Sequence, residues 1–105
     1  MSNDADAGSG LVVALDVSDL SAYERYREDI APLLRGAGGR FRYDFRVTEV
    51  LRAEAAPRIN RLFVLDFPDG ARRDAFFADR RYQAIKRRLF TRAVSNVIVL
   101  AEYGT

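Results

Sequence analysis

The chain has 105 residues and carries 17 Lys and Arg against 15 Asp and Glu, a formal net charge of +2 at pH 7. This length suits one domain built from two packed layers. The chain contains no cysteine and no histidine, which excludes zinc sites of the usual kind, cysteine nucleophiles and histidine general bases. We therefore expect no bound metal and no cofactor, and any catalysis would use carboxylates, tyrosines, arginines or backbone groups.

The first ten residues are small, polar and acidic, without the basic start and apolar middle of a signal peptide. We expect residues 1–9 to form a disordered tail and residues 10–105 to form one domain of a cytoplasmic protein. No stretch approaches the ~20 apolar residues that a membrane helix needs, so a membrane partner is not expected.

The first half of the chain reads as strand, helix, strand. An apolar strand over about 11–17 leads to Ser18 or Asp19, either of which can cap a helix. Pro32 predicts a kink or an end of that helix near residue 31, and the glycines at 36–39 stop it. The second strand, over 40–47, alternates aromatic and charged residues, and we expect it to continue to residue 51 after an irregularity.

The second half reads as strand, helix, strand. A loop over 52–60 precedes an apolar strand over 61–67, and Asp69 can cap the helix that follows. Asp79 offers a second cap that would split this helix. The last strand covers about 97–103. One apolar stripe is expected along the helix, formed by Ala71, Ala75, Ala78, Tyr82, Ile85 and Leu89.

Three of these strands are apolar on both faces, at 11–15, 62–65 and 97–101. A sheet with helices on one side and water on the other should alternate apolar and polar residues instead. Two helices can cover one face only, so the second face needs another cover. The economical cover is a second copy of the chain, which predicts a homodimer.

Short stretches spread over about residues 10–103 carry a resemblance to a known family. They are 17–23 (VSDLSAY), 38–41 (GGRF), 50–51 (VL), 65–68 (LDFP), 79–83 (DRRYQ) and 95–100 (SNVIVL). In this order they resemble the domain of unknown function family 1330, of the dimeric α+β barrel group. The resemblance implies an α+β, ferredoxin-like fold with the βαββαβ order, a four-stranded antiparallel sheet of order 4-1-3-2 and a homodimer. It implies no activity. The chain departs from the family at 44–46, where a glycine break is usual, and at 52–53, where Glu-Gly is usual.

In that sheet the first and third strands are expected to lie parallel and side by side. Asp16 and Asp66 would then meet at one edge and transfer protons to and from a substrate. The beginnings of the other two strands would add Arg40 and Arg42, which could hold an anion, and Asn96. The alternative is that these side chains only cap helices and form ion pairs.

A second candidate lining holds Tyr23, Tyr26, Tyr43, Asp44 and Arg46. Buried tyrosines can orient or protonate a ligand oxygen, so Tyr23 is a candidate catalytic residue and Tyr26, Tyr43 and Asp44 are candidate substrate contacts. The alternative is that the tyrosines pack in the core.

Nucleic acid is an unlikely partner despite the basic segment over 72–92, because exposed helices often carry such charge. RNA-recognition domains share the element order but place stacking aromatics on the first and third strands, whereas here they lie on the second.

The sequence thus predicts a cofactor-free protein that binds a small molecule. If it is an enzyme, we expect an isomerase, cyclase or lyase that acts by proton transfer on an oxygenated substrate. Alternatives are a non-catalytic ligand-binding or structural homodimer and a cofactor-independent monooxygenase.

Overall fold

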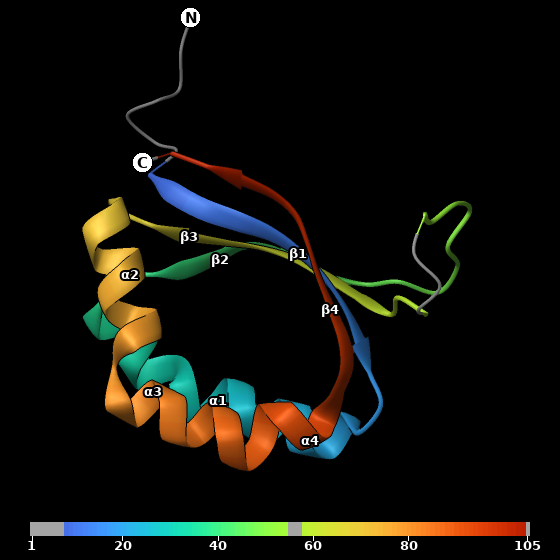
Figure 1. Ribbon diagram of the computed structural model, residues 1–105, viewed down its shortest axis with the longest axis horizontal. Helices are drawn as coiled ribbons and strands as arrows, with labels where there is room; N and C mark the ends of the chain where they lie inside the picture. The colour runs from blue at the N-terminus through green and yellow to red at the C-terminus, as the bar shows by residue number, and fades with distance from the viewer. Residues whose placement is uncertain (1–7, 55–57, 105) are drawn as a thin grey trace, which may run out of the picture.

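The computed structural model describes residues 8–54 and 58–104 and has a four-stranded sheet with all its helices on one face (Figure 1). The elements are β1 (Ser9–Val17), α1 (Leu20–Gly36), β2 (Arg40–Arg46), β3 (Arg61–Phe67), α2 (Gly70–Ala78), α3 (Arg80–Ile85), the π-helix η1 (Lys86–Phe90), α4 (Thr91–Ala93) and β4 (Val94–Tyr103). The predicted tail lies outside the described residues except for its last two positions, and Ser9 already belongs to β1.

The sheet order β2-β3-β1-β4 is the predicted order 4-1-3-2 read from the other edge, so the ferredoxin-like α+β fold is confirmed. The predicted parallel pairing of β1 with β3 is wrong, because these strands pair antiparallel. The crossover through α1 makes β1 and β2 run the same way, and β3 follows β2 in the opposite direction between them. Asp66 therefore pairs with Gly10, whereas Asp16 pairs with Asn96.

Pro32 lies inside α1, and the helix continues to Gly36 instead of ending near residue 31. Proline removes one backbone donor from the helix. Pro32 is exposed, so the carbonyl that loses its partner can be hydrated. The helix begins as predicted, because the Asp19 carboxylate accepts the backbone N–H of Ala22 at 3.1 Å.

Asp69 and Asp79 both cap helices, as predicted, by accepting backbone N–H groups from Arg72 at 2.8 Å and Arg81 at 2.7 Å. The residue Asp79 is extended, with ψ of 127°. This break resets the helical phase, so the predicted stripe is wrong in its first half. The alanines at 71, 75 and 78 are exposed, and Phe76 is buried instead.

The strand β2 ends at Arg46 and does not continue to residue 51 as predicted. Its partner β3 begins at Arg61, which pairs with Arg46, and beyond this pair the Val47 N–H donates to the Asn60 carbonyl at 2.9 Å. Residues 48–54 belong to no strand and project from the sheet (Figure 1). Residues 55–57 of the predicted loop lie outside the described residues.

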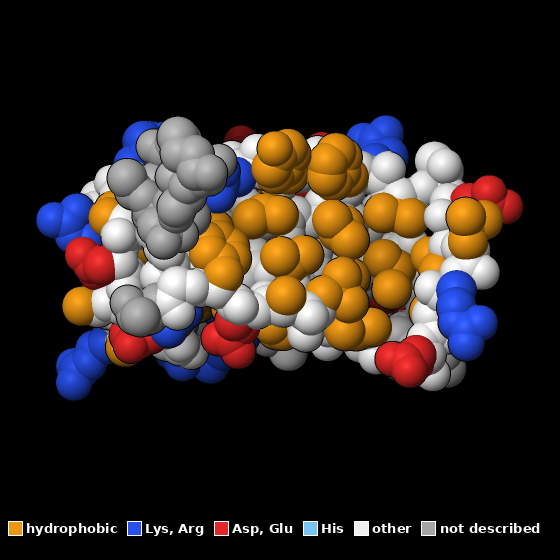
Figure 2. All heavy atoms as spheres, turned by 90° about the horizontal axis from the view of Figure 1, so that it is seen from above, with side chains coloured by type: hydrophobic (Ala, Val, Ile, Leu, Met, Phe, Trp, Pro, Cys, Tyr) orange, Lys and Arg blue, Asp and Glu red, His pale blue; other side chains and the backbone are white. Residues whose placement is uncertain are grey.

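The two faces of the sheet meet different surroundings. One face packs on the helices through side chains such as Val13, Leu15, Phe63 and Leu65. We call the opposite one the outer face, and Figure 2 shows that hydrophobic side chains gather across it. Alternation along the strands assigns to it Val12, Ala14, Tyr43, Phe45, Leu62, Val64, Ile98 and Leu100. Within the described residues, no helix is both long and apolar enough to cross a membrane.

Candidate functional site

A cavity of about 360 Å³ lies between the sheet and the helices. Its volume falls in the range of small-molecule sites. The sheet contributes its inner side chains and the helices contribute mostly aromatic ones. The lining residues are Leu11, Val13, Leu15, Tyr23, Tyr26, Ile30, Phe41, Phe63, Leu65, Phe76, Phe77, Tyr82, Lys86, Phe90, Val97 and Val99.

Three tyrosine hydroxyls are the main polar groups of this cavity. The Tyr26 and Tyr82 hydroxyls hydrogen-bond each other at 3.0 Å, and the Tyr23 hydroxyl accepts from Arg27 Nη1 at 2.8 Å. Burial raises the pKa of all three phenols, and for Tyr26 the neighbouring Tyr82 hydroxyl adds to the rise. The cavity therefore presents neutral hydroxyls at neutral pH, able to donate to a ligand oxygen and to accept from a ligand donor.

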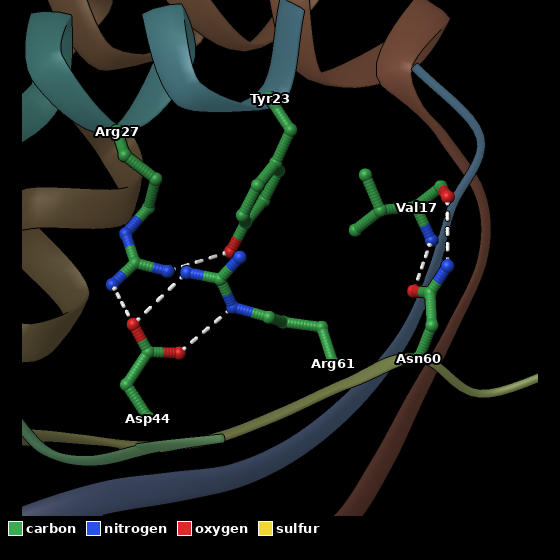
Figure 3. Close-up of polar contacts among 6 residues, drawn as sticks. All are labelled: Val17, Tyr23, Arg27, Asp44, Asn60 and Arg61. Carbon is green, nitrogen blue, oxygen red and sulfur yellow. Dashed lines mark hydrogen bonds and ion pairs between the residues drawn. The ribbon is translucent and has the colours of Figure 1, made fainter. Parts of the chain in front are cut away.

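Tyr23 belongs to a hydrogen-bonded group that we call the polar wall, whose other members are Arg27, Asp44 and Arg61 (Figure 3). Asp44 Oδ2 accepts from Arg27 Nη2 at 2.6 Å, and its other oxygen accepts from Arg61 Nε at 3.0 Å. Burial acts to raise the pKa of Asp44, but the hydrogen bonds from Arg61 and Arg27 outweigh it and hold that pKa below its usual value. Asp44 is therefore ionised at neutral pH and fixes two arginines, and it is unsuited to act as a general acid there.

Arg27 also packs on Phe41, an aromatic ring that lines the cavity. Its guanidinium carbon lies 3.7 Å from the centroid of Phe41, a cation–π contact. Phe41 itself meets Phe63 edge to face at 5.2 Å. These contacts fix the guanidinium that donates to Tyr23, so the orientation of the Tyr23 hydroxyl is set by the wall.

The cavity opens beside β4 and η1. Val97 and Val99 point toward the helix side of the sheet, since they pair with the core residues Leu15 and Val13, yet they are 50% and 49% exposed. Lys86 and Phe90 lie on η1 and line the same cavity. The Lys86 side chain is only half-buried, which places it at the rim.

The structure brings together only part of the second predicted lining. Tyr23 and Tyr26 both line the cavity, and Asp44 lies in the polar wall behind Tyr23. Tyr43 does not belong with them. Its side chain is 56% exposed on the outer face and stacks on Phe45, with ring centroids 5.9 Å apart.

The predicted pairing of two carboxylates at one edge of the sheet is wrong. Asp16 and Asp66 lie near opposite ends of β1, separated by six residues of strand, or roughly 20 Å. Both lie on the outer side of the sheet, because their chain neighbours Leu15 and Leu65 line the cavity on the other side. Neither carboxylate can therefore act on a molecule held in this cavity.

Asp66 nevertheless lies near two of the predicted arginines, Arg40 and Arg42. The Tyr103 hydroxyl donates to Asp66 Oδ1 at 2.6 Å, and Arg40 Nε lies 3.6 Å from Oδ2. Burial and the contact with Asp66 raise the pKa of Tyr103, and the Tyr103 hydroxyl, as the acceptor of a hydrogen bond from Arg42, raises the pKa of Arg42. Sequence reasoning missed Tyr103, whose place over Gly10 follows from the strand register.

Asp16 has a different set of neighbours. It is 6% exposed, pairs in register with Asn96, and lies 3.8 Å from Arg58 Nη2. Asn96 itself is exposed. Across residues 8–54 and 58–104, the carboxylates form no group of three that could hold a metal ion.

The comparisons with known proteins agree with this fold. The model of the family described as "Domain of unknown function (DUF1330)" matches residues 11–103. A crystal structure of RPA0582, a protein of unknown function from Rhodopseudomonas palustris, superposes with a TM-score of 0.77 at 16% identity, covering 98% of this chain and 85% of that one. A dabb family protein with a ferredoxin-like fold from Mesorhizobium loti gives 0.66 at 16% identity, covering 92% and 95%. No curated protein matches the chain.

Proposed function

The chain belongs to the DUF1330 family, and we propose that it binds a small, largely apolar organic molecule carrying at least one oxygen. The observation that supports this most is the cavity of about 360 Å³ whose apolar wall is interrupted by tyrosine hydroxyls. Apolar lining with a few placed polar groups is the usual composition of a ligand site. The apolar body would be held by aromatic contact and the oxygen by a hydroxyl.

Tyr23 is the proposed donor to the ligand oxygen. Its hydroxyl oxygen already accepts from Arg27, which leaves the phenolic proton to be donated. The positively charged guanidinium of Arg27 favours the phenolate form of Tyr23 and so makes its hydroxyl a stronger hydrogen-bond donor. A ketone, ester or quinone oxygen matches this donor.

Catalysis by proton transfer is the second candidate, and the contact between Arg27 and Tyr23 favours it. In that case Tyr23 would protonate or polarise a carbonyl oxygen held in the cavity. Among the described residues, however, no carboxylate lines the cavity. A base would have to come from the substrate or from water, so binding is the function that the side chains support best.

The test uses two neutral probes of similar shape that differ in their oxygen, 2-acetonaphthone and 2-ethylnaphthalene. Isothermal titration calorimetry measures their binding to wild type and to each variant. We expect saturable binding of both probes. Tyr23→Phe should weaken binding of the ketone about fivefold, the effect of one hydrogen bond, and leave the hydrocarbon unchanged.

A blocking variant tests the location of the site. Val99→Trp should fill the opening and abolish binding of both probes, whereas Leu100→Trp, on the same strand but the opposite face, should not. Equal binding by wild type and Val99→Trp would rule out this cavity as the site.

The outer face supports a further proposal, that two copies of the chain form a homodimer through it. Tyr43, Phe45 and Leu100 are each at least half exposed there, and monomeric proteins rarely leave so large an apolar patch in water. The cavity lies on the other side of the sheet, so each copy would keep its own site.

A further inference from the structure

Lys86 differs from every other charged residue of the chain. It is the only lysine, and sixteen arginines carry the remaining positive charge. Among the described residues, it is also the only charged side chain that lines the cavity. The basic segment around Lys86 is typical of a solvated helix surface. Because most of the basic residues in it are arginines of that kind, the sequence does not single out Lys86 as a cavity residue.

Two of the arginines near Lys86 have carboxylate partners. Arg88 donates to Asp29 at 2.6 Å, and Arg81 donates to Asp79 at 2.8 Å. For Lys86, no carboxylate of residues 8–54 or 58–104 lies within 4 Å of the ammonium. An uncompensated positive charge at the rim of an apolar cavity attracts an anion, because aliphatic and aromatic walls screen it less than water does.

The backbone at Lys86 is also unusual. The π-helix η1 begins at this residue, and its carbonyl accepts the backbone N–H of Thr91, five residues on. A π turn inserts an extra residue into the helix and is frequent at functional sites. Here Lys86 and Phe90, at the two ends of η1, both line the cavity. Phe90 packs against Tyr26 with ring centroids 4.9 Å apart, so the turn places a charge beside an aromatic wall.

We propose that the ligand of this cavity carries one carboxylate, held by the Lys86 ammonium at the rim while the apolar body lies among the aromatic side chains. The inference rests on the proposed function and names the ligand class for the same site. A carboxylate fits better than a phosphate, because one lysine offers a single charge, whereas phosphate sites usually combine several donors. The lysine stem is apolar and can follow the cavity wall while its head stays near water.

The experiment compares naphthalene-2-carboxylate with naphthalene-2-carboxamide, which has the same shape without the charge. Each probe is titrated into wild type, Lys86→Met, Lys86→Arg and Arg87→Met, with naphthyl fluorescence as the readout. Arg87 is the exposed neighbour and serves as the matched control for loss of one positive charge. Lys86→Gln replaces the Met variant if circular dichroism shows that the latter does not fold.

We expect wild type to bind the carboxylate about tenfold tighter than the amide, the effect of a hydrogen bond to a charged group. Lys86→Met should lose this preference and keep its affinity for the amide, and Lys86→Arg and Arg87→Met should keep the preference. Equal affinity of wild type for both probes, or a preference that survives in Lys86→Met, overturns the inference and leaves the proposed function standing. If neither probe binds wild type, both the inference and the proposed function fail.

Discussion

Asp44 connects the members of the polar wall, because its carboxylate accepts hydrogen bonds from both Arg27 and Arg61 (Figure 3). Asp44→Asn should lower the free energy of unfolding at pH 7 by about 1–2 kcal/mol, the range for charge-assisted hydrogen bonds after allowance for solvent screening. Urea unfolding measures this. Asp74→Asn is the matched control, because Asp74 is 76% exposed and makes only a 3.4 Å contact with its neighbour Arg73. A loss as large in the control would contradict the assignment.

The pH dependence of stability gives an independent check on Asp44. Its pKa is lowered in the folded chain, with burial opposing and the two arginines favouring the anion. A carboxylate of this kind contributes stability above its unfolded pKa of about 4, and this contribution disappears as the pH falls through the folded value. The difference between wild type and Asp44→Asn should therefore shrink as the pH falls below about 4. A constant difference over this range would argue against the ionised wall.

Among the elements, the end of β1 is held beside the start of β3 by Asn60. Its side-chain oxygen accepts the Val17 N–H at 2.8 Å and its amide donates to the Val17 carbonyl at 2.9 Å (Figure 3). The side chain thus continues the pairing with β1 beyond Arg61, the first residue of β3. We expect Asn60→Ala to cost about 2 kcal/mol of unfolding free energy, since two half-buried backbone groups lose their partners.

Asn60→Asp separates the two hydrogen bonds. An ionised carboxylate still accepts the Val17 N–H but sets an oxygen against the Val17 carbonyl, so this variant should be destabilised at pH 7 as well. Protonation of the new carboxyl restores a donor, and the deficit relative to wild type should narrow at pH 3. Thermal unfolding of both variants at the two pH values measures this, and an equal deficit at both would contradict the role of the amide donor.

The sequence was sufficient to predict the elements that depend on local signals. The caps at Asp19, Asp69 and Asp79 are recognised by short polar side chains before helical residues, and they form as predicted. The mutual direction of β1 and β3 depends instead on how the crossover and the next connection combine. That step was inferred wrongly, and the proposed carboxylate pair failed with it.

The candidate site was predicted only in part for similar reasons. Tyr23 and Tyr26 are three residues apart and share one face of α1, so the helical spacing predicts that both line the same cavity. Lys86 was missed because its place at the cavity depends on the break at Asp79 and on the π turn, which helical periodicity does not reveal. Its one available signal was being the only lysine in an arginine-rich chain.

At the scale of the whole molecule, the sheet separates two surfaces with different proposed roles. Its inner face lines the cavity, and its outer face presents the apolar patch of Figure 2. The two proposals would explain why β1 and β3 are hydrophobic on both sides: one set of side chains would shape the ligand site, and the other set would form the contact between copies. A substitution on the outer face should therefore change assembly while leaving the ligand site in place.

Val64 lies on the outer face in β3, with Val12 of β1 on one side and Tyr43 of β2 on the other. A carboxylate at this position would be buried unpaired between two copies, which costs several kcal/mol. Light scattering should give wild type twice the 11.9 kDa mass of one chain and give Val64→Glu the mass of one chain. Ala78→Glu, on the exposed side of α2, should remain a dimer.

The monomeric variant should still bind 2-acetonaphthone, because its cavity lies on the other side of the sheet. A wild type that stays monomeric at micromolar concentration would refute the dimer, and a Val64→Glu variant that stays dimeric would place the contact elsewhere.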